Sequence, residues 1–303
     1  MRSPGARVQN TSVANDIAHE VLTQNTRAYP ASVSELRSEQ AAIVWISTSG
    51  CEGCTMAMLG ATAPRIEELL AGSLTGIASI ALIHSLLAFD AGDRFIDSLL
   101  AAERGELDPF VLVVEGAPLD RSRAGEGQFN RLGPRTPEAW IESLAPLAAA
   151  IMAIGTCATA GGIPAARGSV TGAMSLERFL GPGVRSKGGL PIVQVPGCAP
   201  QGDAFIEALS YVFLHLEGRV PLDLDEHGRP RWLFDESTPV TVGPTTHTFV
   251  ADCGVPARGW INHIGGCASV GGSCNGCTRP DFPDLGRSAP VEAPQRVVLG
   301  ARR

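Results

Sequence analysis

The sequence predicts an α/β protein with a doubly wound parallel sheet, followed by a small irregular C-terminal domain. Short apolar runs recur between residues 41 and 220, helical patterns separate them, and after about residue 220 the alternation stops. Apolar residues make up 44% of the 303 residues, enough for a substantial core, whereas aromatic residues make up only 5%. With 35 glycines and 22 prolines, this composition favours a loop-rich α/β protein over a helical bundle.

Five apolar runs are predicted to be buried strands of one sheet. Runs of this length without polar alternation are typical of parallel strands that are covered on both faces. Five such strands with helical connections fit the flavodoxin-like strand order 2-1-3-4-5. The predicted strands are residues 41–47, 77–83, 110–115, 149–155 and 191–195.

Four helices are predicted between or after these strands from their start and stop signals. Thr62 is the candidate N-cap of a helix over residues 64–71, and Thr136 is the candidate N-cap of a helix that begins at Pro137. The other two predicted helices are residues 94–103 and 203–216, each followed closely by a glycine.

The chain divides into three predicted parts. Residues 1–40 are polar and form an N-terminal extension, residues 41–220 form the flavodoxin-like domain, and residues 221–303 form an irregular C-terminal domain and tail. The C-terminal part is rich in proline, glycine and cysteine and has no clear periodicity. A small domain of this kind is typically stabilised by a metal centre rather than by its own apolar core.

The charge pattern limits the partners that we expect. The net charge is −7 and the isoelectric point is about 5.4, without a block of lysine and arginine, so nucleic acid is not an expected partner. No stretch approaches 18 apolar residues, and no apolar core of a secretory signal is present near the N-terminus. We therefore expect a cytoplasmic protein with no membrane span of its own, which reaches a membrane only through partners.

Eight cysteines form two groups of four, and the first group follows the predicted strands. Cys51 and Cys54 come after the first strand, Cys157 after the fourth and Cys198 after the fifth. Because the carboxyl ends of parallel strands meet at one edge of a sheet, we expect these side chains to gather there. Four thiolates favour an iron–sulfur cluster. A structural zinc ion and small buried apolar cysteines remain alternatives, and a thioredoxin-like pair explains only the first two.

The second group lies in the last fifth of the chain with the spacing C-x13-C-x6-C-x2-C. This spacing is that of neither the bacterial nor the plant ferredoxins. Four thiolates favour a 4Fe–4S cluster over a 3Fe–4S cluster, which needs three. Zinc is a stronger alternative here than in the first group, because the site is compact and stands alone. The four residues are Cys253, Cys267, Cys274 and Cys277.

The motifs around both groups resemble the small subunit of NiFe hydrogenases. The resemblance runs from about Val44 to Pro283, and the wording of ERGELDPFVLVVEG and RGWINHIGGC is similar to the actinobacterial-type uptake enzymes. Its pieces are WISTSGCEGCTMAML, DPFVLVVEGA, AIGTCATAGGIPAA, SKGGLPIVQVPGCAP and GWINHIGGCASVGGSCNGCTRPDFPD.

The resemblance implies a role for each group. It implies an electron relay in a heterodimer, with hydrogen activated at the NiFe site of a partner large subunit whose cysteine motifs this chain lacks. Glu115, from the VEG motif, is implied to lie beside the first cluster near the subunit interface. The implied ligands of this proximal 4Fe–4S cluster are Cys51, Cys54, Cys157 and Cys198, and those of a second 4Fe–4S cluster are Cys253, Cys267, Cys274 and Cys277.

Three departures from the family pattern affect this interpretation. Cys54 is kept where the oxygen-tolerant subgroup often has aspartate, and PGCAP replaces the usual PGCPP. Most relatives add a histidine and three cysteines for a distal cluster, but no cysteine is left here to accompany His247. We therefore expect no distal cluster. The electron acceptor, or a further redox subunit, is expected to dock near residues 250–280.

Three other functions compete with the hydrogenase interpretation. The chain could be the cluster-bearing subunit of a complex I-like or hydrogenase-related respiratory assembly, or a zinc-stabilised scaffold without enzymatic activity. A flavin protein is disfavoured, because the CxxC occupies the turn where a phosphate-binding loop belongs. Glu52 is expected to be a solvated or interface carboxylate, and His84 is expected to have a structural role.

Overall fold

The computed structural model describes residues 41–234 except 75, 86–91 and 125–128, the backbone of 239–242 and 245–250, and residues 277, 278 and 282. The predicted N-terminal extension, residues 1–40, lies outside the described residues, as do Cys253, Cys267 and Cys274. The backbone of His247 is described, but its side chain is not.

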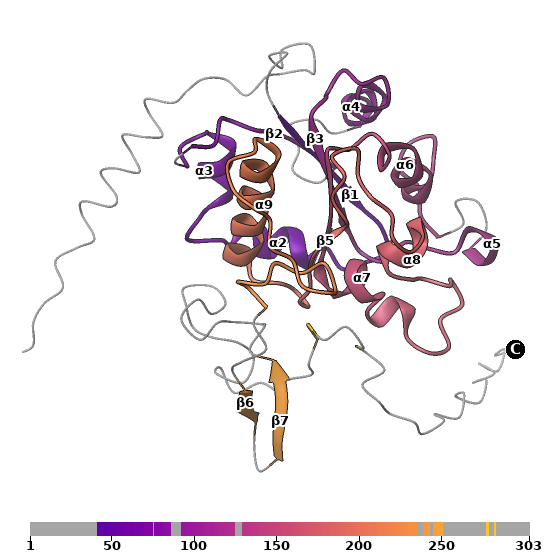
Figure 1. The fold of residues 1–303 in the computed structure, drawn as a ribbon. Helices are drawn as coiled ribbons and strands as arrows, with labels where there is room; N and C mark the ends of the chain where they lie inside the picture. The colour runs from indigo at the N-terminus through magenta and orange to yellow at the C-terminus, as the bar shows by residue number, and fades with distance from the viewer. Residues whose placement is uncertain are drawn as a thin grey trace, which may run out of the picture.

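A five-stranded, fully parallel sheet organises the described part of the chain (Figure 1). Its order, β2-β1-β3-β4-β5, confirms the predicted order. β2 is shorter than the predicted run 77–83, because β1 begins at Ala42, which pairs with Ala81, so the residues before Ala81 have no partner strand. The strands are β1 (Ala42–Ser47), β2 (Ala81–His84), β3 (Phe110–Glu115), β4 (Ala150–Ile154) and β5 (Val193–Val195).

Helices cover both faces of the sheet, as the doubly wound prediction requires. In Figure 1, α3 and α9 lie on one side of the sheet, and α4 and α6 lie on the other. The helices are α2 (Gly53–Leu59), α3 (Ile66–Leu70), α4 (Asp93–Glu103), α5 (Arg121–Ala124), α6 (Pro137–Leu144), α7 (Gly155–Ala160), α8 (Leu176–Leu180) and α9 (Gly202–Leu216), with a short 3-10 helix η2 (Ile163–Ala165).

Each face of the sheet carries its own apolar core. Side chains alternate between the faces of a strand, so Trp45 of β1 packs in one core with Phe205 of α9, and Val44 packs in the other with Leu99 of α4 and Trp140 of α6. All five side chains are fully buried. Burial on both faces explains why the strands are nearly continuous apolar runs.

The helix caps confirm one sequence prediction and correct another. The Thr136 hydroxyl accepts a hydrogen bond from the Ala139 backbone N–H, which confirms it as the N-cap of α6. Thr62 is not the N-cap of α3, which begins after Arg65. The Thr62 backbone N–H and hydroxyl instead donate to the carboxylate of Asp203 in the first turn of α9, so a tertiary contact replaces the local cap.

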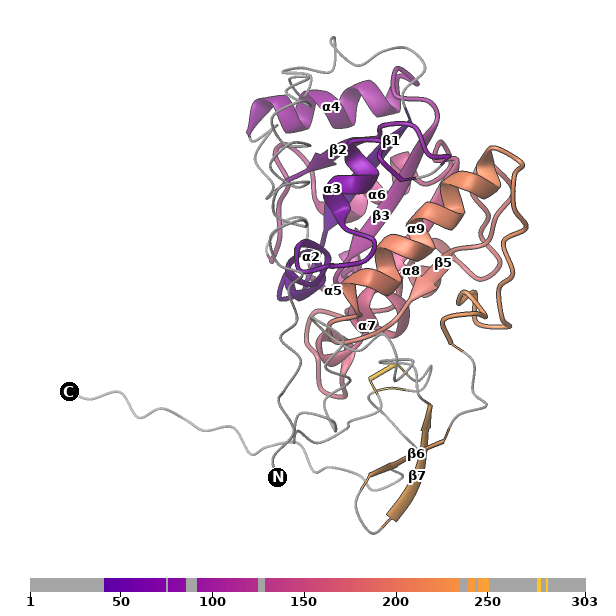
Figure 2. The same cartoon turned by 90° about the vertical axis from the view of Figure 1, so that its left-hand side faces the viewer.

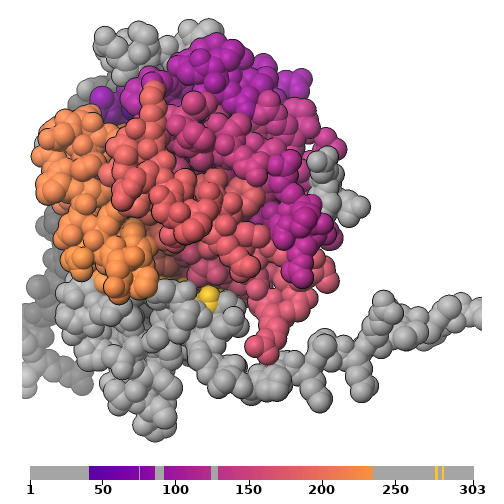
Figure 3. All heavy atoms as spheres, turned by 45° about the vertical axis from the view of Figure 1, so that its right-hand side comes forward, coloured from indigo at the N-terminus to yellow at the C-terminus, as the bar shows by residue number. Residues whose placement is uncertain are grey.

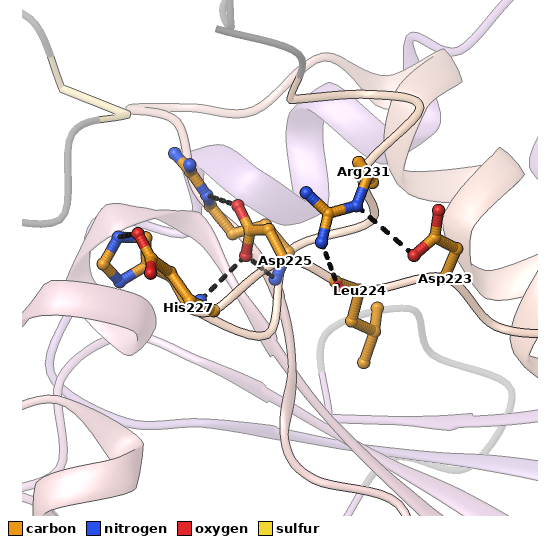
Figure 4. Close-up of polar contacts among 7 residues, drawn as sticks. Asp223, Leu224, Asp225, His227 and Arg231 are labelled. Carbon is orange, nitrogen blue, oxygen red and sulfur yellow. Dashed lines mark hydrogen bonds and ion pairs between the residues drawn. The ribbon is translucent and has the colours of Figure 1, made fainter.

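Ion pairs and hydrogen bonds link side chains within residues 223–231, in the segment that follows α9 (Figure 4). Asp225 accepts from the guanidinium of Arg229 at 2.7 Å and from the His227 backbone N–H at 2.9 Å. Arg231 pairs with Asp223 at 3.3 Å. Farther along, β6 (Pro239–Val242) and β7 (Thr245–Val250) form an antiparallel hairpin. None of the helices in the described part of the chain is long and apolar enough to cross a membrane.

Candidate metal centre

The described cysteines lie at the carboxyl edge of the sheet. Cys51 is in the turn after β1, Cys54 is in the first turn of α2, Cys157 is in α7 directly after β4, and Cys198 follows β5. Figure 2 shows α2 and α7 together at the lower end of the sheet. The structure therefore brings the first predicted group to one edge, while the role of these residues as ligands stays a prediction.

The four thiols are close enough to influence one another's ionisation. Burial raises the pKa of Cys54 well above its usual range, and Glu115, Cys157 and Cys51 raise it further. Burial also raises the pKa of Cys157 to about 11, with added contributions from Cys198 and Cys51. Since a metal binds the thiolate, ligation of iron at this group must displace protons from the buried thiols.

Glycines leave room around three of the four thiols. A Cβ on Gly53 would lie 3.1 Å from Cys51 Sγ, and one on Gly162 would lie 3.0 Å from Cys157 Sγ. A Cβ on Gly155, where φ is +80°, would collide with Cys54 Sγ. This room for the sulfur atoms, together with the four-thiol donor set, fits the iron–sulfur cluster that the sequence predicts.

The geometry required by a single zinc ion can be compared with the described side chains. A zinc ion holds sulfur at about 2.3 Å, so four thiolates on one ion lie about 4 Å from one another. Across the part of the chain that the structure describes, no three histidine, cysteine or acidic side chains are arranged to hold one metal ion. Cys157 interacts electrostatically with Cys51, Cys54 and Cys198, and a group of four neighbouring thiols suits a centre of several atoms.

Glu115 ends β3 beside this group, and its carboxylate accepts four hydrogen bonds. It is 2% exposed. Oε1 accepts from the backbone N–H of Cys54 at 2.9 Å and of Thr55 at 3.3 Å. Oε2 accepts from the indole N–H of Trp45 at 3.2 Å and from the Thr55 hydroxyl at 2.5 Å. Three of these donors are N–H groups, which cannot accept, so both oxygens of Glu115 must act as acceptors. Glu115 is therefore a buried carboxylate that is hydrogen-bonded directly to the backbone of Cys54.

His84 completes this network from the end of β2. Its Nε2 lies 3.1 Å from the Thr55 hydroxyl, whose single proton goes to Glu115, so Nε2 is the donor. Burial lowers the pKa of His84 to about 4, and the ring is therefore neutral near pH 7 with its proton on Nε2. The Trp45 ring packs against the imidazole with 5.0 Å between the ring centroids. The structural role expected for His84 thus includes the orientation of a residue beside the site.

Glu52, between the two cysteines of the CxxC, is less enclosed than Glu115. Its Oε2 accepts from the Ser47 hydroxyl at 2.9 Å. Partial burial raises the pKa of Glu52, although the hydrogen bond from Ser47 acts in the opposite direction. Its backbone is in the left-handed region, with φ at 58°, where the chain turns from Cys51 into α2.

Of the second predicted group, only Cys277 is among the described residues. The carbonyl of Cys277 accepts a hydrogen bond from the hydroxyl of Thr156, which precedes Cys157. Figure 3 shows the described C-terminal residues, in yellow, at the lower edge of the coloured core. One member of the second group therefore lies against the first group, although 120 positions separate Cys157 from Cys277.

Three supporting residues were not identified from the sequence: Trp45, Thr55 and Thr156. Thr55 and Thr156 are each adjacent to a cysteine in the motifs CEGCT and GTC, and that adjacency was an available signal. Trp45 reads as one more apolar residue of a buried strand, and only the parallel pairing of β1 with β3 brings its indole to Glu115.

Comparisons with known proteins agree on one family. A family model described as NADH ubiquinone oxidoreductase, 20 Kd subunit, matches residues 51–212. The periplasmic [NiFeSe] hydrogenase small subunit of Desulfomicrobium baculatum is 30% identical over 288 residues, which cover 82% of this chain and 86% of that protein. The F420 non-reducing hydrogenase I small subunit of Methanosarcina mazei is 26% identical over 89% of this chain and 80% of its own length.

Solved structures give the same result for the fold. The actinobacterial-type NiFe-hydrogenase from Ralstonia eutropha H16 matches with a TM-score of 0.73 and 38% identity, over 81% of this chain and 80% of that one. The [NiFeSe]-hydrogenase of Dm. baculatum matches with a TM-score of 0.65 and 30% identity, over 82% and 98% of the two chains. The chain therefore belongs to the family of NiFe hydrogenase small subunits, and its core to the oxidoreductase family of the 20 Kd subunit.

Proposed function

We propose that this chain relays electrons between the NiFe site of a partner large subunit and an external acceptor through two 4Fe–4S clusters. One observation carries the proposal. Four thiols from three strand ends meet at one edge of the sheet, beside glycines that leave room for their sulfur atoms, and a cysteine of the second group lies against them. When bound, the clusters supply one-electron redox chemistry, and the protein supplies position and electrostatics.

The proposed ligands of the proximal cluster are the four thiols at the carboxyl edge. Cys54 and Cys157 are partly buried, whereas Cys51 and Cys198 are exposed in the isolated chain. The Glu115 carboxylate accepts a hydrogen bond from the Cys54 backbone N–H and places a negative charge beside that proposed ligand. A fixed negative charge disfavours the addition of an electron, so Glu115 is expected to lower the reduction potential of this group.

A large subunit is the proposed partner at this edge. Apolar side chains are exposed on elements that carry or adjoin the cysteines, with Met56 of α2 at 65% and Ile163 of η2 at 68%. Exposed apolar side chains next to exposed thiols suit a surface that a partner chain covers. Covering Cys51 and Cys198 would exclude water from the cluster and bring it toward the NiFe site.

The second proposed cluster is bound by Cys253, Cys267, Cys274 and Cys277, and no distal cluster is proposed. The electron acceptor or a further redox subunit would then dock near residues 250–280. A cytoplasmic location stays a prediction, which cell fractionation tests directly. The comparison protein from D. baculatum is a periplasmic one by its name.

The test is the metal and sulfide content of the chain, purified anaerobically with its large subunit. Two 4Fe–4S clusters give about eight irons per chain beyond the iron of the NiFe site. Cys54→Ser is expected to remove the EPR signal of the proximal cluster alone, and Cys277→Ser that of the second cluster alone. About four irons with one zinc would make the second group a structural zinc site. Iron well above eight would indicate a further cluster and contradict the two-cluster relay.

A complex I-like or hydrogenase-related respiratory assembly remains the second candidate. The description of the matched family model, a 20 Kd subunit of NADH ubiquinone oxidoreductase, favours it. Hydrogen-dependent reduction of a dye by the purified heterodimer separates the two functions. A complex with intact clusters, nickel in its large subunit and no hydrogen-dependent reduction would favour the respiratory assembly.

A further inference from the structure

The hydroxyl of Thr156 connects three parts of the chain, each of which contains a cysteine of the two predicted groups. Thr156 lies between Gly155 and Cys157 at the start of α7 and is 2% exposed. Its hydroxyl oxygen is 3.0 Å from the backbone nitrogen of Gly197, the residue before Cys198. The same oxygen bonds to the carbonyl of Cys277.

The direction of both hydrogen bonds follows from the groups involved. The Gly197 backbone N–H can only donate, so it uses a lone pair of the Thr156 oxygen. The Cys277 carbonyl can only accept, so it takes the single proton of the hydroxyl. A further bond, from the Thr156 backbone N–H to the Gly197 carbonyl at 2.9 Å, holds the backbones of these two residues together. The hydroxyl therefore uses its single proton and one of its two lone pairs, with one bond toward each cysteine group.

We propose that Thr156 is a positioning residue that holds the Cys277 segment against the first cysteine group and provides the hydrogen bond through which electrons pass between the two groups. The proposal rests on the proposed function, because it requires a redox centre at each group. Thr156 is not one of the proposed ligands, but it determines how the two proposed centres are placed and how strongly they are coupled.

The physical reason is the continuous path that this hydroxyl creates. Electron tunnelling falls off more slowly along covalent and hydrogen bonds than across an unbonded gap. From Cys157 the path runs through one peptide bond to Thr156, along its side chain, and across the hydrogen bond to Cys277. A reduced cluster held by the first group would supply one electron, which a cluster held by the second group would accept, while Thr156 keeps its proton and no bond is broken.

The arrangement also explains why a hydroxyl is needed at this position. A valine of nearly the same shape would fill the same space but would leave the Gly197 N–H and the Cys277 carbonyl without their bonds. A serine keeps both bonds and loses only a methyl group. The two substitutions therefore separate the hydroxyl from the volume of the side chain.

The experiment compares Thr156→Val, Thr156→Ser and Thr159→Val in the complete heterodimer with its large subunit. Thr159 is the matched control, because it lies in the same helix and, among the described residues, its buried hydroxyl has no hydrogen-bond partner. Iron content and EPR spectra report whether each group holds its cluster. The magnetic interaction between the two reduced centres reports their relative placement, and light-triggered reduction measures electron transfer between them.

We expect Thr156→Val either to lose iron from the second group alone or to weaken the magnetic interaction and slow the transfer several-fold. Thr156→Ser and Thr159→Val are expected to behave like the unsubstituted protein. Unchanged iron, interaction and rate in Thr156→Val would overturn the proposal, as would equal losses in the valine and serine variants. Absence of a redox centre at the second group of the unsubstituted protein would instead overturn the proposed function, so the two failures are distinguishable.

Discussion

At Glu115, a single buried side chain connects the sheet to the cysteine turn. Its carboxylate is bonded by β1 through Trp45 and by the start of α2 through Cys54 and Thr55. These partners come from two separate stretches of sequence, and the glutamate, on a third, holds them in one arrangement. Two predictions concern this network.

The first prediction compares Glu115→Gln with Glu52→Gln. The amide of a glutamine at position 115 cannot accept at both ends, so at least one buried N–H loses its bond, at a cost of about 1–3 kcal/mol in the free energy of unfolding. Glu52 is half-buried and has one hydrogen bond, from Ser47, so its substitution is expected to cost under about 1 kcal/mol. Denaturation in urea measures both, and equal losses would contradict the special role of Glu115.

The second prediction concerns the pH dependence contributed by His84. The pKa of His84 is near 6.5 when unfolded and about 4 when folded, so between these values the unfolded chain binds more protons. Its contribution to stability is therefore complete above about pH 6.5 and is lost as the pH falls toward 4, by up to about 3 kcal/mol.

His84→Gln is the variant that isolates this contribution. The pKa of Glu52 is raised, so its contribution to stability changes with pH in the direction opposite to that of His84. Subtracting the stability curve of the variant from that of the unsubstituted protein removes the contribution of Glu52, which both proteins share. Unfolding free energies between pH 4 and 8 should show a shallower fall in the variant toward acid pH. Parallel curves would show that His84 does not titrate as its burial implies.

Among the elements, α7 depends most directly on glycine. Gly155 begins the helix with φ at +80°, and a Cβ there would collide with Cys54 Sγ. Gly189 has the same φ, with nothing within 4 Å of an added Cβ. The third prediction is that Gly155→Ala and Gly189→Ala incur similar backbone strain, about 1–2 kcal/mol each, while only the first displaces a thiol.

Iron content and the EPR spectrum of the first group test this pair. Gly155→Ala is expected to lose iron from that group, and Gly189→Ala is expected to retain it. If both variants keep full iron, the space beside Cys54 is not required for the cluster. If both lose it, backbone strain rather than the close approach is responsible.

The elements also show what the sequence could and could not predict. All five strands, their order and four helices follow from apolar runs and from signals such as Thr136. The short helices α2 and α7 are not among the predicted helices, because each begins beside a cysteine motif and has little apolar periodicity. Thr62 was misassigned because its hydrogen-bonding capacity is used by Asp203, 141 positions away.

For the site, sequence reasoning could name the cysteines of the first group, which follow recognisable strands, and Glu115, which the family resemblance implies and which ends a strand. It could not predict that Trp45 and Thr55 donate to the Glu115 carboxylate, or that His84 bonds to Thr55, because these contacts depend on the register of β1, β2 and β3. The place of Cys277 beside Thr156 was equally hidden, as no periodic signal connects the C-terminal cysteines to the sheet.

For the whole molecule, the sheet has an apolar core on each face, and Cys54 is the one cysteine of the described residues that packs against either core. Each core packs one face of the sheet against helices, and nearly all of its members are aliphatic or aromatic. The fourth prediction is that iron removal leaves residues 41–234 folded. Far-ultraviolet circular dichroism should keep its helix and strand signal, and thermal unfolding should stay cooperative.

The control for this prediction is a substitution within a core. Leu209→Ala, in α9, removes a fully buried side chain and should cost about 2–5 kcal/mol, with or without iron. A non-cooperative melt of the iron-free protein would show instead that the cluster is part of the scaffold of the sheet.

The wide separation of the proposed proximal ligands in the sequence has a consequence for biosynthesis. Cys51 and Cys198 are 147 positions apart, and Cys198 reaches the site only after β5 has paired with β4. At the usual speed of a ribosome, roughly 7–30 seconds pass between the synthesis of these two residues. Until then Cys51 and Cys54 are thiols on a growing chain, without the companions that would hold iron. The site is therefore most readily lost in that interval, because oxidation of these two thiols before iron arrives would prevent them from binding it.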